Sequence, residues 1–307
     1  MDRFQAMQVF SRIVELGGFG KAADDLGLPR ASVTLAIQQL EAHLGVQLLQ
    51  RTTRQVRATL DGEAYYQRCR QLLDDVDELE GSLSVQRGRP RGTLRVDMPA
   101  TFGCTWLLPR LPEFYRRYPE LQLDIAFNDR QVHLQREGAD CAIRAGNLVD
   151  LALAARPIVR MRQVTCASPG YLAEAGLPRR LEDLASHRAV NFPSSSGRFF
   201  GFEFEVGGQV RDLQLPGVLA VNSADAYVTA CEAGFGLVQV PCYHVQRQLA
   251  AGTLVEVLPQ HPVPAWPVFA VYPPHRQLSS RVRVFIDWVI EVLHGLAEAQ
   301  PHLMIKA

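Results

Sequence analysis

The stretch from Gly18 to Ala23, GFGKAA, matches the G-x-G-x-x-A pattern with which a turn holds the pyrophosphate of a dinucleotide. That chemistry requires a β-strand before the turn and an acidic side chain about 20 residues after it. Glu41 has the required distance, but it lies inside an apolar run at helical spacing. The residues before the turn also recur at helical spacing, and they are Phe4, Met7, Phe10, Ile13 and Val14. We therefore do not expect a dinucleotide site here.

Other reactive residue types lack the spacing that their chemistry needs. The six cysteines form no C-x-x-C pair, and the eight histidines show neither H-E-x-x-H nor H-x-x-x-H spacing. Residues 93–307 contain no order of Ser, His and Asp, and no pair of acids, that would form a catalytic set. We expect reduced thiols, no metal, no cofactor and no enzymatic activity.

The same turn fits two short helices of the kind that read DNA. Gly18 can cap a helix over about residues 19–26, and Gly27 permits the left-handed turn that ends it. Pro29 then opens a second helix, which extends to about Leu44. The apolar face expected to be buried consists of Val33, Ile37, Leu40 and Leu44.

The polar face of this second helix has the chemistry that base edges in the major groove demand. Arginine suits guanine, glutamine suits adenine, and hydroxyl groups suit either base. A solvated surface face is the alternative for any one of these residues taken alone. The candidate DNA contacts on the two helices are Lys21, Arg30, Ser32, Thr34 and Gln38.

The segment LLQRTTRQVRAT that follows alternates in a strand-turn-strand manner, which is typical of a wing. Its tip is suited to phosphates or to the minor groove. Residues 1–60 carry seven basic and five acidic side chains, a net +2, whereas residues 61–84 carry two and seven, a net −5. Only the first segment is therefore expected to face a polyanion. The wing candidates for DNA contact are Arg51, Thr52, Thr53 and Arg54.

Residues 10–66 resemble the winged helix-turn-helix of the LysR-type transcriptional regulators, most of all in A-A-x-x-L, L-E-x-x-L-G and L-x-R-T-T-R-x-V-x-x-T-x-x-G. The resemblance continues, in order, through GTLRVDMPATFG, LLPRLPEFYRRYPELQLDI, GADCAIRAGNL, VNSADAYVTACEAGFGLVQVP and GTLVEVLP of the family's effector domain. Two segments depart from the family pattern. GFG stands where the family usually has a Ser or Thr cap, and LPRAS stands where polar residues usually begin the recognition helix. They bear on the base contacts more than on the fold.

The resemblance implies an N-terminal all-α winged helix-turn-helix with a long linker helix, followed by an α/β effector domain of periplasmic-binding-protein type (type 2) with two subdomains. Strands alternating with helices after Thr93 independently indicate an α/β region. The expected boundaries are 1–60 for the DNA-binding domain, 61–85 for the linker helix, 86–92 for a hinge and 93–307 for the effector domain. Subdomain I is expected over 93–163 and 264–300, and subdomain II over 164–263.

The linker helix has an apolar seam. Thr59 can cap the helix, and the acids Asp61 and Glu63 suit its first turn. The seam residues, at spacings of four and three, are Tyr65, Cys69, Leu72, Val76, Leu79 and Leu83. They could pack on their own domain, but the length of the seam and the family's linker helix favour a partner helix. We expect a homodimer or homotetramer, with Leu72, Val76 and Leu79 at the contact.

A small effector is expected between the two subdomains, and a carboxylate is the favoured anionic group. Two expected helix N-termini, each a natural anion site, follow strands at Thr101 and at Asn222. Capping alone is the alternative at both. The candidate effector contacts are Thr101, Phe102, Asn128, Arg144, Phe192, Asn222, Ser223 and Ala224, in which Phe192 is equally suited to the core.

Composition places the chain among ordinary globular proteins, with 47% hydrophobic and 21% charged residues. It has no apolar run near the roughly 18 residues of a membrane span, and its N-terminus lacks the features of a secretory signal. We expect a cytoplasmic regulator whose partners are operator DNA, the effector, a second copy of the chain and RNA polymerase. An architectural DNA-binding protein is the alternative, but it would not need a domain of this size for a ligand.

Overall fold

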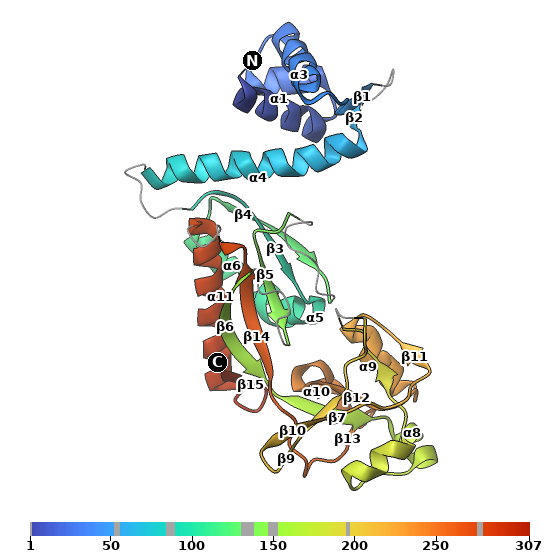
Figure 1. Ribbon diagram of the computed structural model, residues 1–307. Helices are drawn as coiled ribbons and strands as arrows, with labels where there is room; N and C mark the ends of the chain where they lie inside the picture. The colour runs from blue at the N-terminus through green and yellow to red at the C-terminus, as the bar shows by residue number, and fades with distance from the viewer. Residues whose placement is uncertain are drawn as a thin grey trace. The chain divides into compact units, whose positions relative to one another are not determined.

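The computed structural model describes residues 2–51, 56–83, 90–129, 138–146, 153–194, 197–274 and 279–307. The chain forms two compact units, Met1–Gly92 and Thr93–Ala307. Figure 1 shows that the first unit is mainly helical and that the second combines helices with sheets. Among the described helices, none is long and apolar enough to cross a membrane.

The N-terminal unit has the order of a winged helix-turn-helix followed by a long helix. Three helices come first, a two-stranded wing follows, and the linker helix ends the unit. In chain order these elements are α1 (Arg3–Leu16), α2 (Phe19–Leu26), α3 (Arg30–Leu44), β1 (Leu49–Arg51), β2 (Val56–Ala58) and α4 (Leu60–Leu83).

Local backbone chemistry explains where α2 and α3 begin and end. α2 starts after Gly18 and ends at Gly27, whose φ of 64° is left-handed and costs a glycine little. Pro29 occupies the cap of α3 rather than its first helical position. Its missing N–H therefore removes no bond from the helix. The predicted turn is confirmed.

An apolar core holds the first three helices and the start of α4 together. The predicted core face of α3 is correct at Val33, Ile37 and Leu40, which are buried. It is wrong at Leu44, which is 37% exposed. Leu44 is the last residue of α3, and Gly45 then ends the helix in a left-handed conformation. The final turn therefore extends past the core.

The wing is fixed to α3 through Glu41. Its carboxylate accepts the backbone N–H groups of Leu48 at 2.8 Å and of Leu49 at 3.0 Å. β1 and β2 then pair antiparallel, with Leu49 opposite Ala58. Glu41 thus has a structural role in place of the ribose contact that the rejected dinucleotide site would need.

The first half of α4 belongs to the N-terminal unit. Thr59 caps it as predicted, because its Oγ1 accepts the N–H of Gly62 at 2.9 Å. Cys69 is fully buried in the unit's core and Tyr65 packs against that core. Burial raises the pKa of the Cys69 thiol to about 11. The predicted seam is therefore wrong at Tyr65 and Cys69, which already have a partner within the chain.

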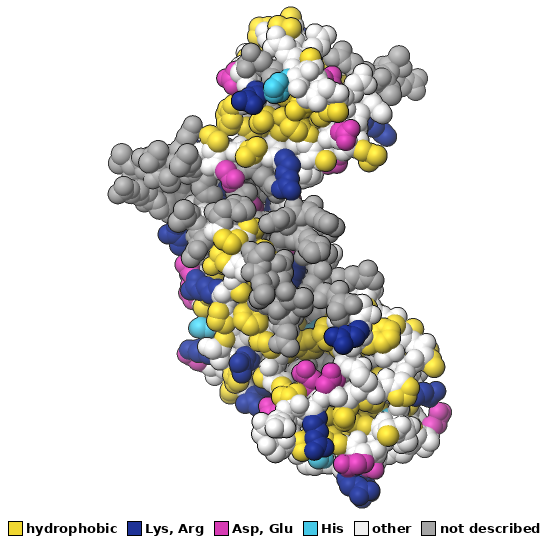
Figure 2. Space-filling model, viewed as in Figure 1, with side chains coloured by type: hydrophobic (Ala, Val, Ile, Leu, Met, Phe, Trp, Pro, Cys, Tyr) yellow, Lys and Arg dark blue, Asp and Glu magenta, His cyan; other side chains and the backbone are white. Residues whose placement is uncertain are grey.

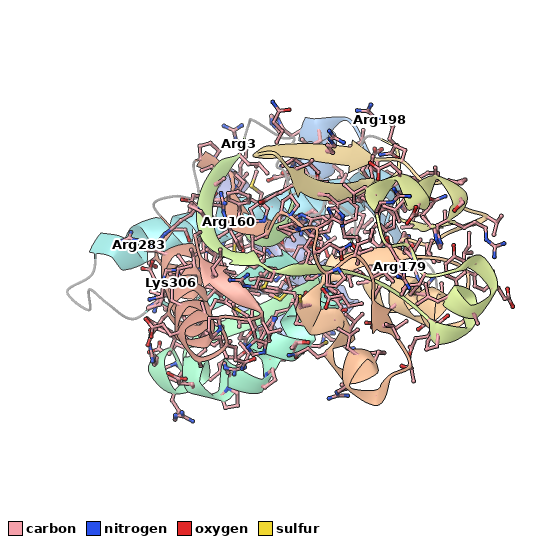
Figure 3. All side chains as sticks on the ribbon, turned by 90° about the horizontal axis from the view of Figure 1, so that it is seen from below. Arg3, Arg160, Arg179, Arg198, Arg283 and Lys306 are labelled. Carbon is pink, nitrogen blue, oxygen red and sulfur yellow. The ribbon has the colours of Figure 1, made fainter. Side chains whose placement is uncertain are left out.

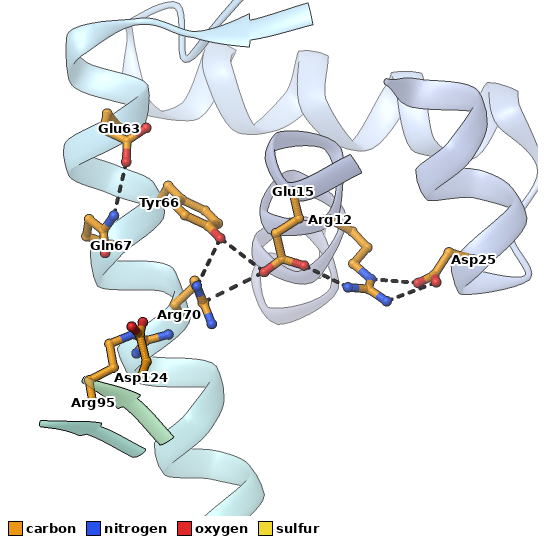
Figure 4. Close-up of polar contacts among 9 residues, drawn as sticks. All are labelled: Arg12, Glu15, Asp25, Glu63, Tyr66, Gln67, Arg70, Arg95 and Asp124. Atoms are coloured by element: carbon orange, nitrogen blue, oxygen red, sulfur yellow. Dashed lines mark hydrogen bonds and ion pairs between the residues drawn. The ribbon is translucent and has the colours of Figure 1, made fainter. Parts of the chain in front are cut away.

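An ion-pair network links α1 to α2 and α4 (Figure 4). Arg12 donates to both oxygens of Asp25, at 2.6 and 2.9 Å, and to Glu15 at 2.8 Å. Glu15 also accepts from the Tyr66 hydroxyl at 3.1 Å and lies 3.7 Å from Arg70. The network fixes the direction in which α4 leaves the helix-turn-helix.

A six-stranded sheet forms the first part of the effector unit, which we call subdomain I. Its strand order is β15-β6-β14-β5-β3-β4, with β3 and β5 parallel and β14 antiparallel to both β5 and β6. The strands, and the helix α11 that packs on β6 and β15, are β3 (Gly92–Met98), β4 (Leu121–Phe127), β5 (Cys141–Ala145), β6 (Ala154–Met161), β14 (Trp266–Tyr272), β15 (Met304–Lys306) and α11 (Ser280–Ala299).

Subdomain II is built around β7 (Gln163–Ala167). β7 pairs antiparallel with β12 on one side and β13 on the other, and two further strand pairs, β8 with β11 and β9 with β10, lie beside this sheet. Its other elements are α8 (Pro169–Ala175), a 3-10 helix (Leu181–Ser186), β8 (Val190–Asn191), β9 (Phe202–Val206), β10 (Gln209–Leu213), β11 (Leu219–Ala220), α9 (Ala224–Glu232), β12 (Val238–Pro241), α10 (Cys242–Ala251) and β13 (Val255–Glu256).

The two crossings between the subdomains lie side by side. The chain was expected to leave subdomain I near Arg162 and to return near Pro264. In the structure Gln163 Nε2 donates to the carbonyl oxygen of Pro264 at 2.9 Å. Two adjacent crossings form the hinge that a cleft between subdomains requires.

Residues 105–119 lie in the region where strands alternate with helices, but they do not form one regular helix. The chain passes from α5 (Ala100–Phe102) through a π-helical and a 3-10 turn into α6 (Leu111–Arg117). Pro109 and Pro112 lack the N–H groups that a continuous ladder would need. The irregular turns are the physical consequence of that sequence.

The alternation of strands and helices after Thr93 does not by itself predict five of the strands, which are β6, β9, β10, β13 and β15. β9 and β10 had a visible signal, since apolar and polar residues alternate in FEFEV before Gly207-Gly208. β6 contains Pro157, which argues against an inner strand, but β14 shifts register beside it. β15 carries the sheet past residue 300, where the sequence ended subdomain I.

Candidate functional site

The outer face of α3 carries most of the predicted base contacts. Ser32 and Gln38 are exposed, and Thr34 is half-buried. Leu35 lies one turn from both Ser32 and Gln38 and is 53% exposed. Because it is apolar, the sequence argument did not include it. Ser32, Leu35 and Gln38 therefore form a row of two hydrogen-bonding groups and one apolar group. This combination suits a base edge that carries a thymine methyl.

Arg30 begins α3 and leans back over α2. Its guanidinium lies 3.7 Å from Asp24, and both side chains are 73% exposed. A Cβ on Gly20 would lie 3.3 Å from the Arg30 guanidinium, so the glycine leaves room for it. The ion pair is weak because it is exposed, and a phosphate or guanine can compete for Arg30. Lys21 on α2 is also exposed.

The remaining candidates of the N-terminal unit are described in part. Arg51 ends β1, and Thr52, Thr53 and Arg54 lie outside the described residues. On α4, Leu72 is 52% exposed and Val76 is half-buried, while the side chain of Leu79 lies outside the description. A large apolar side chain exposed on a helix suits a partner surface.

In the effector unit, one carboxylate joins the two turns that were expected to bind an anion. Asp129 follows β4 and accepts the backbone N–H of Ala100 at 3.1 Å through one oxygen. Its other oxygen accepts the N–H of Ala224 at 2.8 Å. Ala100 lies in subdomain I and Ala224 in subdomain II. The two turns do meet, but the expectation of open N–H groups is wrong, since Asp129 occupies them.

The side chains of these turns differ in their contacts. Thr101 Oγ1 donates to Asp225 at 3.0 Å, which is a second bond between the subdomains. Ser223 stands at the cap position of α9, but its side chain makes no capping bond. Asn222 beside it is exposed. The two turns therefore present an exposed amide and the carboxylates of Asp129 and Asp225.

Arg144 and Asn128 share one buried acid. The Arg144 guanidinium pairs with Asp97, with side-chain exposures of 7% and 2%, and the Asn128 amide donates to the second oxygen of Asp97. Arg144 Nη2 is buried and makes no hydrogen bond within the described part of the chain. The pair stabilises the ends of β3 and β5. The expectation that Arg144 faces the cleft is corrected by this burial.

The two phenylalanine candidates differ in their surroundings. Phe102 is 2% exposed within the core of subdomain I, so the expectation that it covers an effector is wrong. Phe192 is half-buried and its ring lies 5.4 Å from that of Tyr227 and 6.3 Å from that of Phe200. Phe192 thus belongs to an aromatic group of subdomain II, partly open to solvent.

Three aromatic side chains from distant segments meet across the subdomains, and the sequence argument missed them. The ring of Trp106 lies 5.5 Å from Tyr243, and Tyr243 lies 4.2 Å from His244. Trp106 Nε1 and His244 Nδ1 are buried and make no hydrogen bond with another described residue. Burial lowers the pKa of His244 to about 4, against the opposing charges of Asp129 and Asp225. The ring is therefore neutral at physiological pH.

Figure 2 shows one face of the effector unit. Basic and acidic side chains are interspersed on that face and form no single stripe. Arg160, Arg179 and Arg198, which Figure 3 labels, are exposed on this unit. The row of candidate base contacts lies instead on the N-terminal unit.

Two known families match the chain. "Bacterial regulatory helix-turn-helix protein, lysR family" matches residues 4–63, and "LysR substrate binding domain" matches residues 87–294.

Relatives match over nearly their full length. An uncharacterised HTH-type transcriptional regulator of Escherichia coli, YhjC, is 41% identical over 95% of this chain and 98% of its own. An HTH-type transcriptional repressor of Pseudomonas aeruginosa is 40% identical over 98% and 95%. Among solved structures, CrgA of Neisseria meningitidis, a LysR-type transcriptional regulator, is similar with a TM-score of 0.56 and 30% identity over 94% of this chain and 97% of its own.

Proposed function

The chain belongs to the LysR family of DNA-binding transcriptional regulators, and we propose that it reads its operator with the outer face of α3 while a carboxylated small molecule controls it from the cleft. It is not an enzyme. The observation that carries the DNA-reading part is the exposed row of Ser32, Leu35 and Gln38 on the second helix of a helix-turn-helix.

The wing and the linker helix complete this proposal. The basic wing would hold phosphates and thereby set the register of α3 on the duplex. The exposed Leu72 supports a dimer in which two copies of α4 pack together, so that two copies of α3 meet two half-sites. RNA polymerase is the further partner we propose, because a regulator bound beside a promoter can contact it.

The observation that supports a carboxylated effector is the bridge made by Asp129. Its oxygens accept N–H groups from the first residues of α5 and α9, at 3.1 and 2.8 Å. A carboxylate therefore fits this place in size and charge, and the N–H groups at a helix start favour one. Tyr243 nearby is half-buried and would suit an apolar or aromatic remainder of the molecule.

Selection of bound fragments from genomic DNA tests the proposed function. We expect fragments that share one sequence with two related halves, bound with at least about a thousandfold preference over random DNA. Gln38→Ala should change the selected bases at one position, whereas Gln8→Ala on α1 should not. A footprint without any sequence preference would favour the architectural alternative and overturn the proposal.

A further inference from the structure

The effector unit already contains a carboxylate where the proposed effector would place its own. Asp129 bonds to Ala100 in subdomain I and to Ala224 in subdomain II. Thr101 and Asp225 make a second bond between the subdomains. Asp129 and Ala224 are 95 residues apart in the chain, so their bond joins elements that no local structure holds together.

We propose that Asp129 is a removable latch between the subdomains. In the absence of effector its carboxylate holds α9 against subdomain I. The anionic group of the effector binds by taking its place on the N–H groups of Ala100 and Ala224. The displacement step rests on the proposed carboxylated effector, whereas the latch itself does not.

Charge explains why the two carboxylates exclude each other. The N–H groups of Ala100 and Ala224 are the donors that the bridge uses, and a second carboxylate on them would lie within a few ångströms of the first. No compensating cation comes from His244, because its pKa of about 4 keeps the ring neutral. Asp225 adds a further negative charge to the same end of the cleft. Asp129 is half-exposed, so once released its carboxylate can be hydrated.

Chemical rescue of Asp129→Ala tests the latch. Removing the carboxylate should lower the Tm of the effector unit by about 3 to 6 °C, because two charge-assisted hydrogen bonds are lost. Sodium formate should reverse at least half of this fall in Tm, whereas sodium chloride at the same concentration should not. The wild type and Asp124→Ala, which removes an exposed acid of β4, should show no such response to formate.

Amide hydrogen exchange provides the second measurement, and it does not depend on Tm. Exchange at Ala224 should be at least about tenfold faster in Asp129→Ala, and formate should slow it again. Unchanged protection of Ala224 in a folded Asp129→Ala would overturn the latch. The latch would also be overturned if formate changed the Tm of Asp129→Ala no more than that of the wild type.

Effector displacement has a separate outcome. Any carboxylate that stabilises the wild type should bind Asp129→Ala about tenfold more tightly, because it no longer competes with the latch. Equal affinity would overturn displacement. Formate rescue without any carboxylate that stabilises the wild type would instead leave the latch in place and contradict the proposed effector.

An independent observation concerns Leu35, which is 53% exposed between Ser32 and Gln38 on α3. We infer that Leu35 contacts the C5 methyl group of a thymine in the operator, since an apolar side chain in a row of polar ones gains from a methyl and not from a bare base edge. This inference rests on the proposed reading face of α3.

Deoxyuridine tests it, because it differs from thymidine only by that methyl group. In a selected operator, replacing the contacted thymine in one half-site only should weaken wild-type binding about fourfold, the value of one buried methyl. Leu35→Ala should lose this sensitivity, and Leu44→Ala, at the exposed end of the same helix, should keep it. Sensitivity that persists in Leu35→Ala would overturn the contact. Absence of any selected operator would count against the proposed function instead.

Discussion

The ion pairs beside the candidate sites of the two units differ in their exposure. In the N-terminal unit, the Arg12–Asp25 pair lies at the surface, with side-chain exposures of 40% and 36%, and Arg30 is more exposed still. In the effector unit, Asp97 and Arg144 are paired out of contact with water. The Asp129 bridge between the subdomains is half-exposed and lies between these extremes.

This difference corresponds to two kinds of ligand. A polyanion is met by exposed charges whose contribution falls with salt, because each contact releases counterions. A small molecule is met by fixed groups in a cleft, where each polar atom needs a partner before the ligand arrives. The charged side chains beside the proposed DNA-reading face are thus exposed to solvent, whereas Asp97 and Arg144 of the effector unit are buried as a pair.

The largest contrast is expected from breaking one pair in each unit. Arg144→Met leaves the carboxylate of Asp97 buried, which should lower the free energy of unfolding by about 3 to 5 kcal/mol. Arg12→Met should cost no more than about 1 kcal/mol per exposed pair. Fluorescence in urea reports the effector unit selectively, since Trp106, Trp266 and Trp288 all lie in it. Circular dichroism follows the helical unit. Equal losses would remove the contrast.

The linker helix offers the next largest effect. Val76→Asp would place a carboxylate in the proposed contact between two copies of α4. Dimerisation should weaken about a hundredfold, or roughly 3 kcal/mol, in analytical ultracentrifugation. Asp75→Asn on the same turn is the control and should leave the dimer intact. A fully dimeric Val76→Asp at micromolar concentration would move the interface elsewhere.

His244 should make the stability of the effector unit depend on pH. Burial lowers its pKa from 6.5 to about 4, so the unfolded chain binds the proton more readily. The wild type therefore loses stability as pH falls from about 6.5 towards 4. His244→Gln should remove a penalty that reaches about 3 kcal/mol at pH 4 and is absent at pH 8. Urea unfolding at the two pH values measures it, and parallel pH profiles for variant and wild type would contradict the burial.

The smallest effect is expected at the wing. Arg51→Ala and Arg54→Ala should each lower the slope of log affinity against log salt by about one, and by the same amount for operator and random DNA. Binding measured by fluorescence anisotropy at several salt concentrations tests this. A loss confined to the operator would show that these arginines read bases rather than phosphates.

Local features of the N-terminal unit could be predicted from the sequence, because each depends on neighbours. Apolar spacing predicted the buried face of α3 at Val33, Ile37 and Leu40, and Gly27 marked the turn before it. The error at Leu44 came from the tertiary surroundings, since spacing does not say where a core ends. Periodicity also could not tell that Cys69 packs inside its own unit and not on a partner.

In the effector unit, the sequence predicted which two turns come together but not the residues that they bond to. Strand ends and helix starts placed Thr101 and Ala224 at one opening, and the structure brings both turns to Asp129. The partners of those turns depend on contacts between residues about 95 positions apart, which no local pattern encodes. Trp106 and Tyr243 meet for the same reason, and Arg144 was misplaced because its partner Asp97 lies on another strand.

The central claim is that the proposed cleft takes a carboxylate while α3 reads DNA. Thermal-shift measurement of the full chain against metabolites, each paired with its methyl ester, tests that claim most directly. We expect the stabilising compounds to be acids whose esters fail, and Asp129→Ala to bind these acids about tenfold more tightly. At least one of these acids should also change operator affinity. If only neutral or cationic compounds stabilise the protein, or if acid and ester are equivalent, the carboxylate cleft is contradicted.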